Sequence, residues 1–322
     1  MSRISAVSLA SLALASLLQG ACSRTASTNT PRPIEVWTLP APSISSPPGA
    51  DASGVASLIE IDSVSLRAVE VRKGAGVALI TNYQGGRYHP ETVRSLAIDS
   101  VVLDRFATRL VSGAARDKRI ILDFQFSTPD DLPELAAVAR AVGLVSRASG
   151  QTSLSLIVPA QDTSAYPTLV LARLAEMLIV RLDGEHRPGT PAGPPVTPDF
   201  ITRSIGVRAR LIGASRIGVE IPLFGYLWQR GGNVAPITFA RAQELVRSES
   251  GVLTRDPPSQ FLTASGRDGW TLWVPDARTV QFIADVARRR GVASFHLAGP
   301  DGADPEIFLQ GRRLITASQA RR

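Results

Sequence analysis

The chain has 322 residues, of which 44% are apolar and 20% are charged, and this composition excludes a disordered protein. The formal net charge of +7 comes almost wholly from arginine, since lysine occurs only at Lys73 and Lys118. The arginines form no stripe with interleaved aromatic residues, and the run at 288–290 closes a predicted helix, where cations are favoured. The sequence therefore does not favour nucleic-acid binding.

The amino-terminal segment has the features of an export signal. Arg3 precedes the apolar run AVSLASLALASLL, and small residues follow as far as Cys22. The run is shorter than the ~20 residues that a membrane-spanning helix needs. We predict a signal peptide over residues 1–21 and, over 22–54, a Pro- and Ser-rich tether that holds one short strand at 34–40.

Cys22 is the only cysteine, so the chain offers this thiol no disulfide partner. Its surroundings resemble a bacterial lipoprotein signal, with Gly20 and Ala21 in place and Gln19 where leucine is usual. The resemblance implies lipidation of Cys22, a membrane anchor through that lipid and, from Ser23, an outer-membrane location facing the periplasm. An ordinary signal peptide with an incidental cysteine is the alternative.

From Val55 onward, strand-like apolar segments alternate with helix-like segments, as in a parallel sheet covered by helices. About eight strands, without a G-x-G-x-x-G turn, favour one α/β domain over 55–322, a (β/α)8 TIM-type barrel rather than an open doubly wound sheet. The segment 36–81 is short and loop-rich for the start of a barrel, so irregular first strands are an open alternative. Strands are predicted at 54–63, 76–83, 119–126, 153–160, 177–185, 216–226, 271–276 and 292–299, and helices at 90–115, 129–145, 167–176, 199–213, 238–249 and 277–291.

Polar and aromatic residues follow several of these strands, where barrel enzymes place their chemistry. Asp123 and Gln125, in the stretch IILDFQF, are two residues apart and so point to one face of an extended chain. Aromatic rings and hydrogen-bonding groups at other strand ends suit a sugar ligand.

Five segments in chain order resemble glycoside hydrolase family 18, the chitinase family, in its bacterial branch related to spore-cortex and peptidoglycan hydrolases. TNY resembles the third-strand segment, and RIILDFQF lies where the D-G-x-x-x-D-x-E strand is expected. LIVRLDGEH resembles M-x-Y-D-E-H, RIGVEIPLFGYLW resembles G-I-P-x-Y-G-Y-x-W, and the segment from TLW to EIF resembles the closing run. The resemblance covers about residues 77–308.

In that family a glutamic acid protonates the glycosidic oxygen, and the N-acetyl oxygen of the substrate attacks the anomeric carbon, a route that differs from the usual pair of carboxylates. The resemblance implies that Asp123 orients the acetamide and that Gln125 replaces the acid. Lys118 and Arg119 stand where Asp-Gly usually open the motif. An amide cannot donate the proton, and general acid catalysis typically contributes a factor of about 10² to 10⁴.

The resemblance also implies the remaining site residues. Asp183 falls where a tyrosine that binds the acetamide is expected, Gly184 replaces the next Asp, and Glu185 and His186 match the family's E-H. Phe295 takes the place of the tryptophan that forms the floor of the sugar site. The other expected contacts are Phe224 in place of a tyrosine, the retained Tyr226, Trp228 and Trp273, and Asn82 and Tyr83, which are either sugar contacts or loop hydrogen-bonders.

Other polar residues have structural interpretations. Asp276 is expected to cap the helix at 277–291, and His89 and His296 are isolated. Asp183, Glu185 and His186 could together imitate a metal site, but the loop offers no fourth ligand, so we predict no metal and no cofactor. No G-x-S-x-G turn occurs.

Three functions follow. The favoured one is a catalytically impaired, envelope-anchored barrel that binds an N-acetylated glycan, peptidoglycan or chitin-like. The second is an active glycosidase of β-1,4-linked N-acetylglucosamine glycans whose acid has moved to Asp183 or Glu185. The third is an envelope assembly protein with no sugar ligand. The oligomeric state is not predicted.

Overall fold

The computed structural model describes residues 35–39, 56–85, 87–116, 118–125, 128–150, 153–161 and 163–308, and of 35–39 only the backbone. The predicted signal peptide at 1–21 and Cys22 lie outside these residues. None of the described helices is long and apolar enough to cross a bilayer.

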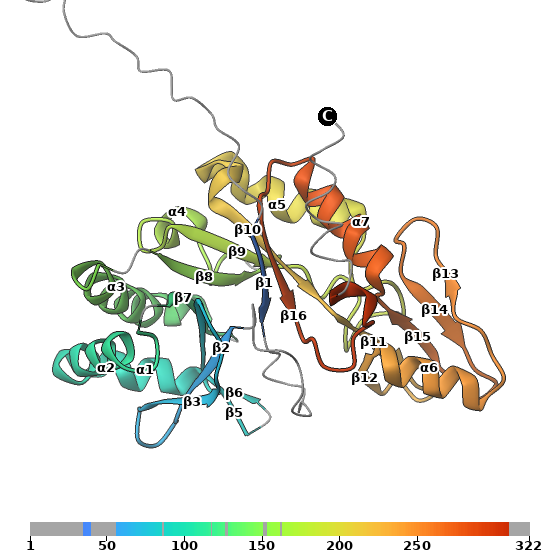
Figure 1. Ribbon diagram of the computed structural model, residues 1–322, viewed down its shortest axis with the longest axis horizontal. Coiled ribbons are helices and arrows are strands. Elements are labelled where there is room, and N and C mark those ends of the chain that lie inside the picture. The colour runs from blue at the N-terminus through green and yellow to red at the C-terminus, as the bar shows by residue number, and fades with distance from the viewer. Residues whose placement is uncertain are drawn as a thin grey trace, which may run out of the picture. The chain divides into compact units, whose positions relative to one another are not determined.

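The main sheet has nine strands in the order β1-β16-β10-β9-β8-β7-β4-β2-β3 (Figure 1). The first eight in this order pair in parallel, and β3 pairs antiparallel to β2. The eight parallel strands confirm the predicted (β/α)8 TIM-type fold. They are β1 (Glu35–Leu39), β2 (Ser57–Ile61), β4 (Val77–Thr81), β7 (Arg119–Asp123), β8 (Leu154–Pro159), β9 (Met177–Arg181), β10 (Ile217–Pro222) and β16 (Ser294–Ala298), and β3 is Ala68–Arg72.

The start of the barrel is irregular. β2 and β4 are joined through the antiparallel strand β3 rather than through a helix, and no pairing between β1 and β2 occurs in the described part of the chain. β1 pairs with β16 along its whole length. The strand expected inside the tether is therefore a barrel strand, and the barrel begins at Glu35 rather than at residue 55.

Helices follow most of the later strands. The single helix predicted at 90–115 is two helices, because the Asp99 side chain accepts a hydrogen bond from the amide of Val101 and begins a new helix. α1, α2 and α3 pack against one another, and α5 packs against α7. The helices of the barrel are α1 (Pro90–Ile98), α2 (Ser100–Ser112), α3 (Leu132–Ala148), α4 (Thr168–Leu171), α5 (Pro198–Ile212) and α7 (Ala277–Arg288).

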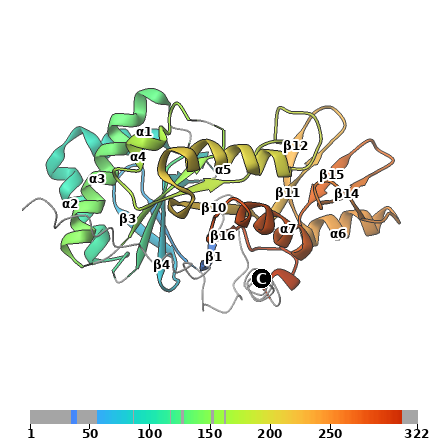
Figure 2. The ribbon, with the colours of Figure 1, turned by 90° about the horizontal axis from the view of Figure 1, so that it is seen from above.

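A second sheet is inserted between β10 and α7, on the side of the main sheet away from α1, α2 and α3 (Figures 1 and 2). The single strand predicted at 216–226 divides at Leu223 into β10 and β11, which belong to different sheets. The strand predicted at 271–276 is part of the insert and not of the barrel. The insert comprises β11 (Phe224–Trp228), β12 (Val234–Thr238), α6 (Phe239–Ser248), β13 (Thr254–Arg255), β14 (Leu262–Ser265) and β15 (Thr271–Val274).

The strand pleat divides the barrel's apolar residues into two clusters. One face of each strand packs under the helices in the largest core cluster, and the other face lines the barrel interior. The interior cluster consists of Ala56, Leu58, Val77, Leu79, Ile121, Ile157 and Ile179, with Met177 against it. These residues fill the interior below the carboxyl ends of the strands, so the polar positions beyond them stand on an apolar base.

Candidate functional site

Three charged residues enter the barrel interior near the carboxyl ends of β7, β9 and β10. Asp123 ends β7, Arg181 ends β9, and Glu220 lies near the end of β10. In the register of the sheet Glu220 lies directly beside Arg181. Each of the three is two residues beyond an interior residue, Ile121, Ile179 or Gly218, so the pleat turns all three inward.

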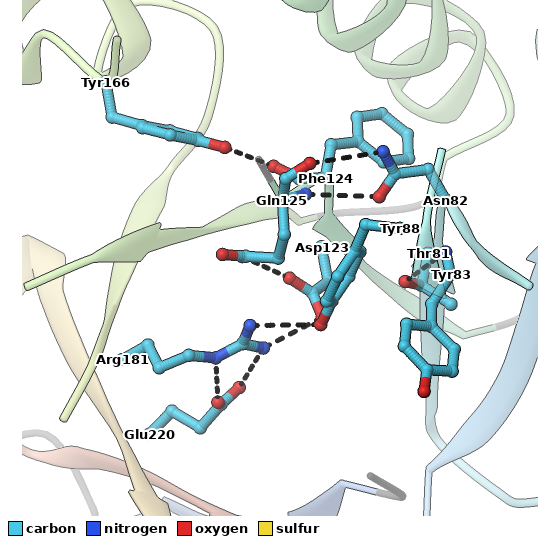
Figure 3. A network of polar contacts seen from close by, with 10 residues as sticks. All are labelled: Thr81, Asn82, Tyr83, Tyr88, Asp123, Phe124, Gln125, Tyr166, Arg181 and Glu220. Carbon is cyan, nitrogen blue, oxygen red and sulfur yellow. Dashed lines mark hydrogen bonds and ion pairs between the residues drawn. The ribbon is translucent and has the colours of Figure 1, made fainter. Parts of the chain in front are cut away.

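These groups form one network with Tyr88 and Gln125 (Figure 3). Arg181 donates from Nη2 to Asp123 Oδ2 at 2.8 Å, and it donates from Nε and Nη2 to the two carboxylate oxygens of Glu220. The Tyr88 hydroxyl lies 3.4 Å from Asp123 Oδ2, and Gln125 Nε2 donates to Asp123 Oδ1. The side chain of Asp123 is thus surrounded by donors from its own chain.

Burial governs the acidity of this network. Burial raises the pKa of Glu220, and the charges of Asp123 and Asp183 add to the shift while Arg181 opposes it. Burial likewise raises the pKa of Tyr88 well above its ordinary value. The single guanidinium of Arg181 is shared by two carboxylates, which leaves the mouth of the barrel rich in negative charge.

The position of Gln125 is set by its backbone. The Asn82 side chain pairs with it twice, since Asn82 Nδ2 donates to the Gln125 carbonyl at 3.4 Å and the Gln125 amide donates to Asn82 Oδ1 at 3.2 Å. The Tyr166 hydroxyl donates to the carbonyl of Phe124. Asn82 is fully buried, so it braces Gln125 and offers no surface to a sugar. Of the two alternatives for Asn82, a sugar contact or a loop hydrogen-bonder, its contacts support the second.

Tyr83 and Tyr88 lie on a short hairpin of β5 (Tyr83–Gln84) and β6 (Arg87–Tyr88) that follows β4. Their rings meet edge to face with centroids 4.9 Å apart. The Tyr83 hydroxyl points away from the network, whereas the Tyr88 hydroxyl points into it (Figure 3). The hairpin therefore contributes Tyr88, rather than the predicted Tyr83, to the charged groups.

The three polar residues after β9 separate. Asp183 lies close enough to Arg181 and Asp123 to feel their charges, and burial raises its pKa. Glu185 instead accepts a hydrogen bond from the amide of Thr197 at 2.7 Å, at the beginning of α5. His186 Nδ1 lies 3.0 Å from the carbonyl oxygen of Pro191 within its own loop. Only Asp183 of these three joins the network.

Aromatic residues of the insert form a row on one face of β11. The rings of Phe224 and Tyr226, and those of Tyr226 and Trp228, meet edge to face with centroids 5.9 Å apart. Burial and the charge of Asp183 raise the pKa of Tyr226, which places the row next to the charged network. The Trp228 indole donates to the carbonyl of Thr190, so the loop after β9 covers the far end of the row.

Trp273 lies on β15 directly opposite Tyr226. Its indole nitrogen is shielded from solvent and has no hydrogen-bond partner among the described residues. Buried donors without a partner are rare in native proteins. Tyr226 and Trp273 are therefore the two predicted aromatic contacts that the structure brings together beside Asp183.

Phe295 corrects an expectation. It is fully buried in the core between the strands and the helices, and the guanidinium of Arg288 on α7 lies over its ring at 5.9 Å. The neighbouring His296 faces the barrel interior instead, where burial lowers its pKa to about 3. The pleat thus turns Phe295 away from the interior, and its ring cannot form the floor of a sugar site.

Asp276 and His89, for which the sequence indicated structural roles, form local hydrogen bonds at the beginnings of helices. Asp276 caps α7 by accepting from the amide of Thr279 at 2.9 Å, as expected, and also pairs with Arg255. His89 bridges the carboxylate of Glu91 and the carbonyl of Gln84 at the start of α1. Within the described ranges no group of three or more His, Cys, Asp or Glu side chains could hold a metal ion.

Sequence reasoning missed Arg181, Glu220 and Tyr88. A signal for the first two was present, because each is a charge inside an otherwise apolar parallel strand, in MLIVR and in IGVEIP. In the family motifs quoted above they stand at the M of M-x-Y-D-E-H and at the first G of G-I-P-x-Y-G-Y-x-W. Two departures that looked unrelated along the chain are neighbours in the sheet.

No family model and no curated protein matches the chain. The chain is, however, similar to several solved structures. A chitinase from Chromobacterium violaceum ATCC 12472 has a TM-score of 0.72 at 17% identity, over 90% of this chain and 100% of that one. The spore cortex-lytic enzyme SleL from Bacillus cereus has a TM-score of 0.72 at 15% identity, over 89% of this chain and 74% of that one.

A class V chitinase from Nicotiana tobaccum, a glutamate-to-glutamine mutant in complex with NAG4, has a TM-score of 0.70 at 13% identity, over 89% of this chain and 98% of that one. At these identities the likeness concerns the fold. The protein has the barrel of chitinases and spore cortex-lytic enzymes, a glycoside hydrolase family 18-like fold.

Proposed function

We propose that this protein binds an N-acetylated glycan, peptidoglycan or chitin-like, at the carboxyl ends of its barrel strands and does not hydrolyse it. One observation carries the proposal: the side chain where the proton donor is expected is the amide of Gln125, and its Nε2 donates to Asp123. A carboxamide has no acidic proton to give to a glycosidic oxygen. The amide also remains able to hold hydrogen bonds.

The surroundings of Gln125 support binding. Tyr226 and Trp273 lie opposite each other beside the network, and the Trp273 indole N–H has no partner among the described residues. Aromatic faces suit a sugar, which presents C–H faces. Among the similar structures, the tobacco chitinase in complex with NAG4 is itself a glutamate-to-glutamine mutant.

The test is calorimetric titration with chitin oligomers of four sugars, together with an assay of their cleavage. The native protein is expected to bind and not to cleave. Replacing the aromatic side chain in Trp273→Ala should weaken binding at least about tenfold, which corresponds to about 1.4 kcal/mol. Phe295→Leu is the matched control, because Phe295 lies in the core beneath the helices and should leave affinity unchanged. Cleavage by the native protein would contradict the proposal.

A second function has its own observation. Asp183 lies beside Asp123 and Arg181, and burial raises its pKa, which favours a protonated carboxyl that could act as an acid. In that case Asp183 gives its proton to the glycosidic oxygen while the bond from that oxygen to the anomeric carbon breaks. The substrate's acetamide oxygen supplies the new electron pair, and water then opens the cyclic intermediate and returns the proton.

Asp183→Asn distinguishes this second function, with Glu185→Gln as its control. Glu185 is engaged with the amide of Thr197 and, at 3.6 Å, with Arg203, so it is a poorer candidate acid. An active native enzyme that loses turnover in Asp183→Asn and keeps it in Glu185→Gln would establish the second function. A folded protein that neither binds nor cleaves any glycan would leave the third, an assembly protein without a sugar ligand.

The place of action is proposed from the sequence. The export signal at 1–21 and Cys22 support a lipid-anchored protein of the cell envelope, facing the periplasm from the outer membrane. The full chain labelled with radioactive palmitate should carry the label, and Cys22→Ser should not. Label in neither form would favour an ordinary, cleaved signal peptide.

A further inference from the structure

We propose that Arg181 and Glu220 form a lock that keeps Asp123 away from any ligand, so that this site carries a second block on hydrolysis besides Gln125. The inference rests on the proposed function, since it concerns a site that binds without cleaving. Arg181 and Glu220 act through Asp123 and are therefore positioning residues. The structure assigns this role through contacts, burial and strand register.

The contacts leave Asp123 no free direction. Its Oδ2 accepts from Arg181 at 2.8 Å and faces the Tyr88 hydroxyl at 3.4 Å, while its Oδ1 accepts from Gln125. The residue is 0% exposed to solvent. To orient an acetamide, Asp123 would have to release one of these donors. The role that the family resemblance implies for Asp123 is thus blocked by its own neighbours.

The lock is held by charge. Arg181 is 13% exposed and pairs with two carboxylates, with Asp123 through Nη2 and with Glu220 through Nε and Nη2. Removing the guanidinium from this place would leave both carboxylates unpaired in the interior, which is costly. The N–H of an acetamide is neutral, so a hydrogen bond from it to Asp123 would not replace the charge of the guanidinium. A sugar cannot therefore displace Arg181 from Asp123.

The lock is also matched in shape. Glu220 and Arg181 are directly beside each other in the register of β10 and β9. In the family motifs these positions hold glycine and methionine, so the chain carries a longer, charged side chain at both places. A lone Glu220 or a lone Arg181 would be an unpaired charge in the barrel. The two departures are explained together as one ion pair that fills the space next to Asp123.

The experiment compares four full-length proteins with a fluorogenic glycoside of the N-acetylglucosamine trimer. They are the native chain, Gln125→Glu, the double variant Arg181→Met with Glu220→Gly, and the triple variant that adds Gln125→Glu to it. The triple variant should turn over at least about 100-fold faster than Gln125→Glu, because general acid catalysis needs both the acid and a free Asp123, and the other two proteins should show no turnover. Circular dichroism confirms that each variant is folded.

A binding measurement tests the lock without turnover. The double variant should gain at least about tenfold in affinity for the N-acetylated trimer over the glucosamine trimer, because Asp123 becomes available to the acetamide. The native protein should lack this gain. Should the triple variant not fold, Arg181→Lys in the Gln125→Glu background replaces it, since lysine keeps the charge but cannot bridge two carboxylates with a planar fork.

The outcomes separate this inference from the proposed function. Equal turnover by Gln125→Glu and the triple variant overturns the lock and leaves the proposed function intact. A folded triple variant without turnover, together with no gain in acetamide preference, also overturns it. Turnover by the native protein refutes the proposed function itself.

Discussion

The two halves of the barrel interior are lined by the same strands and filled in opposite ways. Toward the amino ends, residues such as Leu79, Ile121 and Ile179 pack against one another in an apolar cluster. Two positions further along β7 and β9, Asp123 and Arg181 carry charges. A barrel interior can be filled by apolar layers throughout, as the first half shows. The charged half is therefore kept for something other than stability.

The comparison also shows what a buried charge needs. Asp123 and Glu220 each pair with Arg181, which comes from another strand and serves both of them. Desolvation of such groups can cost more than their attraction returns, and hydrophobic replacements are often as stable. Apolar packing stabilises the amino half regardless of exact geometry, whereas the carboxyl half depends on each partner being present.

Breaking the charged half should have the largest effect. Arg181→Met leaves the carboxylates of Asp123 and Glu220 unpaired in the interior, and removing one partner of a buried pair typically costs about 3–5 kcal/mol. Urea unfolding measures this loss. The control is Arg181→Met with Glu220→Gly, which removes a carboxylate as well and should recover part of the stability. Equal losses in both variants would show that the charges are not what Arg181 balances.

Breaking the apolar half should cost nearly as much and leave the site intact. Ile179→Ala removes a fully buried side chain two residues before Arg181 on the same strand, and such truncations typically cost about 2–5 kcal/mol. The same urea titration applies. Affinity for the N-acetylglucosamine tetramer should not change in the folded variant. A loss of affinity without a loss of stability would contradict the division into two halves.

Comparing the native protein with Glu220→Gln over a range of pH isolates one group of the charged half, because both proteins share the contribution of the buried His296. Burial raises the pKa of Glu220 from 4.5 to about 7, so the folded chain holds a proton that the unfolded chain has lost. Stability from this group is fully present below pH 4.5 and falls as the pH rises to about 7, by roughly 3 kcal/mol at 1.36 kcal/mol for each pKa unit. Melting temperatures across this window should fall less in Glu220→Gln than in the native protein.

The smallest effect is expected at the edge of the network. Tyr88→Phe removes a hydroxyl that lies 3.4 Å from Asp123 and 3.3 Å from Arg181, both long for strong hydrogen bonds. The loss should be below about 1 kcal/mol in urea unfolding. Because the ring stays against Tyr83, its packing serves as an internal control. A loss as large as that of Arg181→Met would make Tyr88 a principal member of the lock.

Periodicity was enough to predict much of the fold. The alternation of apolar strands with helices predicted the parallel barrel, and the period of two placed Asp123 and Gln125 on one face, where they do contact each other. The Asp276 cap followed from its position before an amphipathic helix. These features depend on residues close together along the chain, so the sequence carries their signal.

What the tertiary structure decided depends on which strands lie side by side. Alternation puts Phe295 and His296 on opposite faces, but only the packing of α7 shows that Phe295 is the one beneath the helices. The pairing of Arg181 with Glu220 comes from the register of β9 and β10, which are joined through a long loop and a helix. By itself, the sequence determined that Gln125 stands where the family resemblance places the acid. The structure added that Asp123 beside it is held by two charges from distant strands, because register and burial are properties of the assembled sheet.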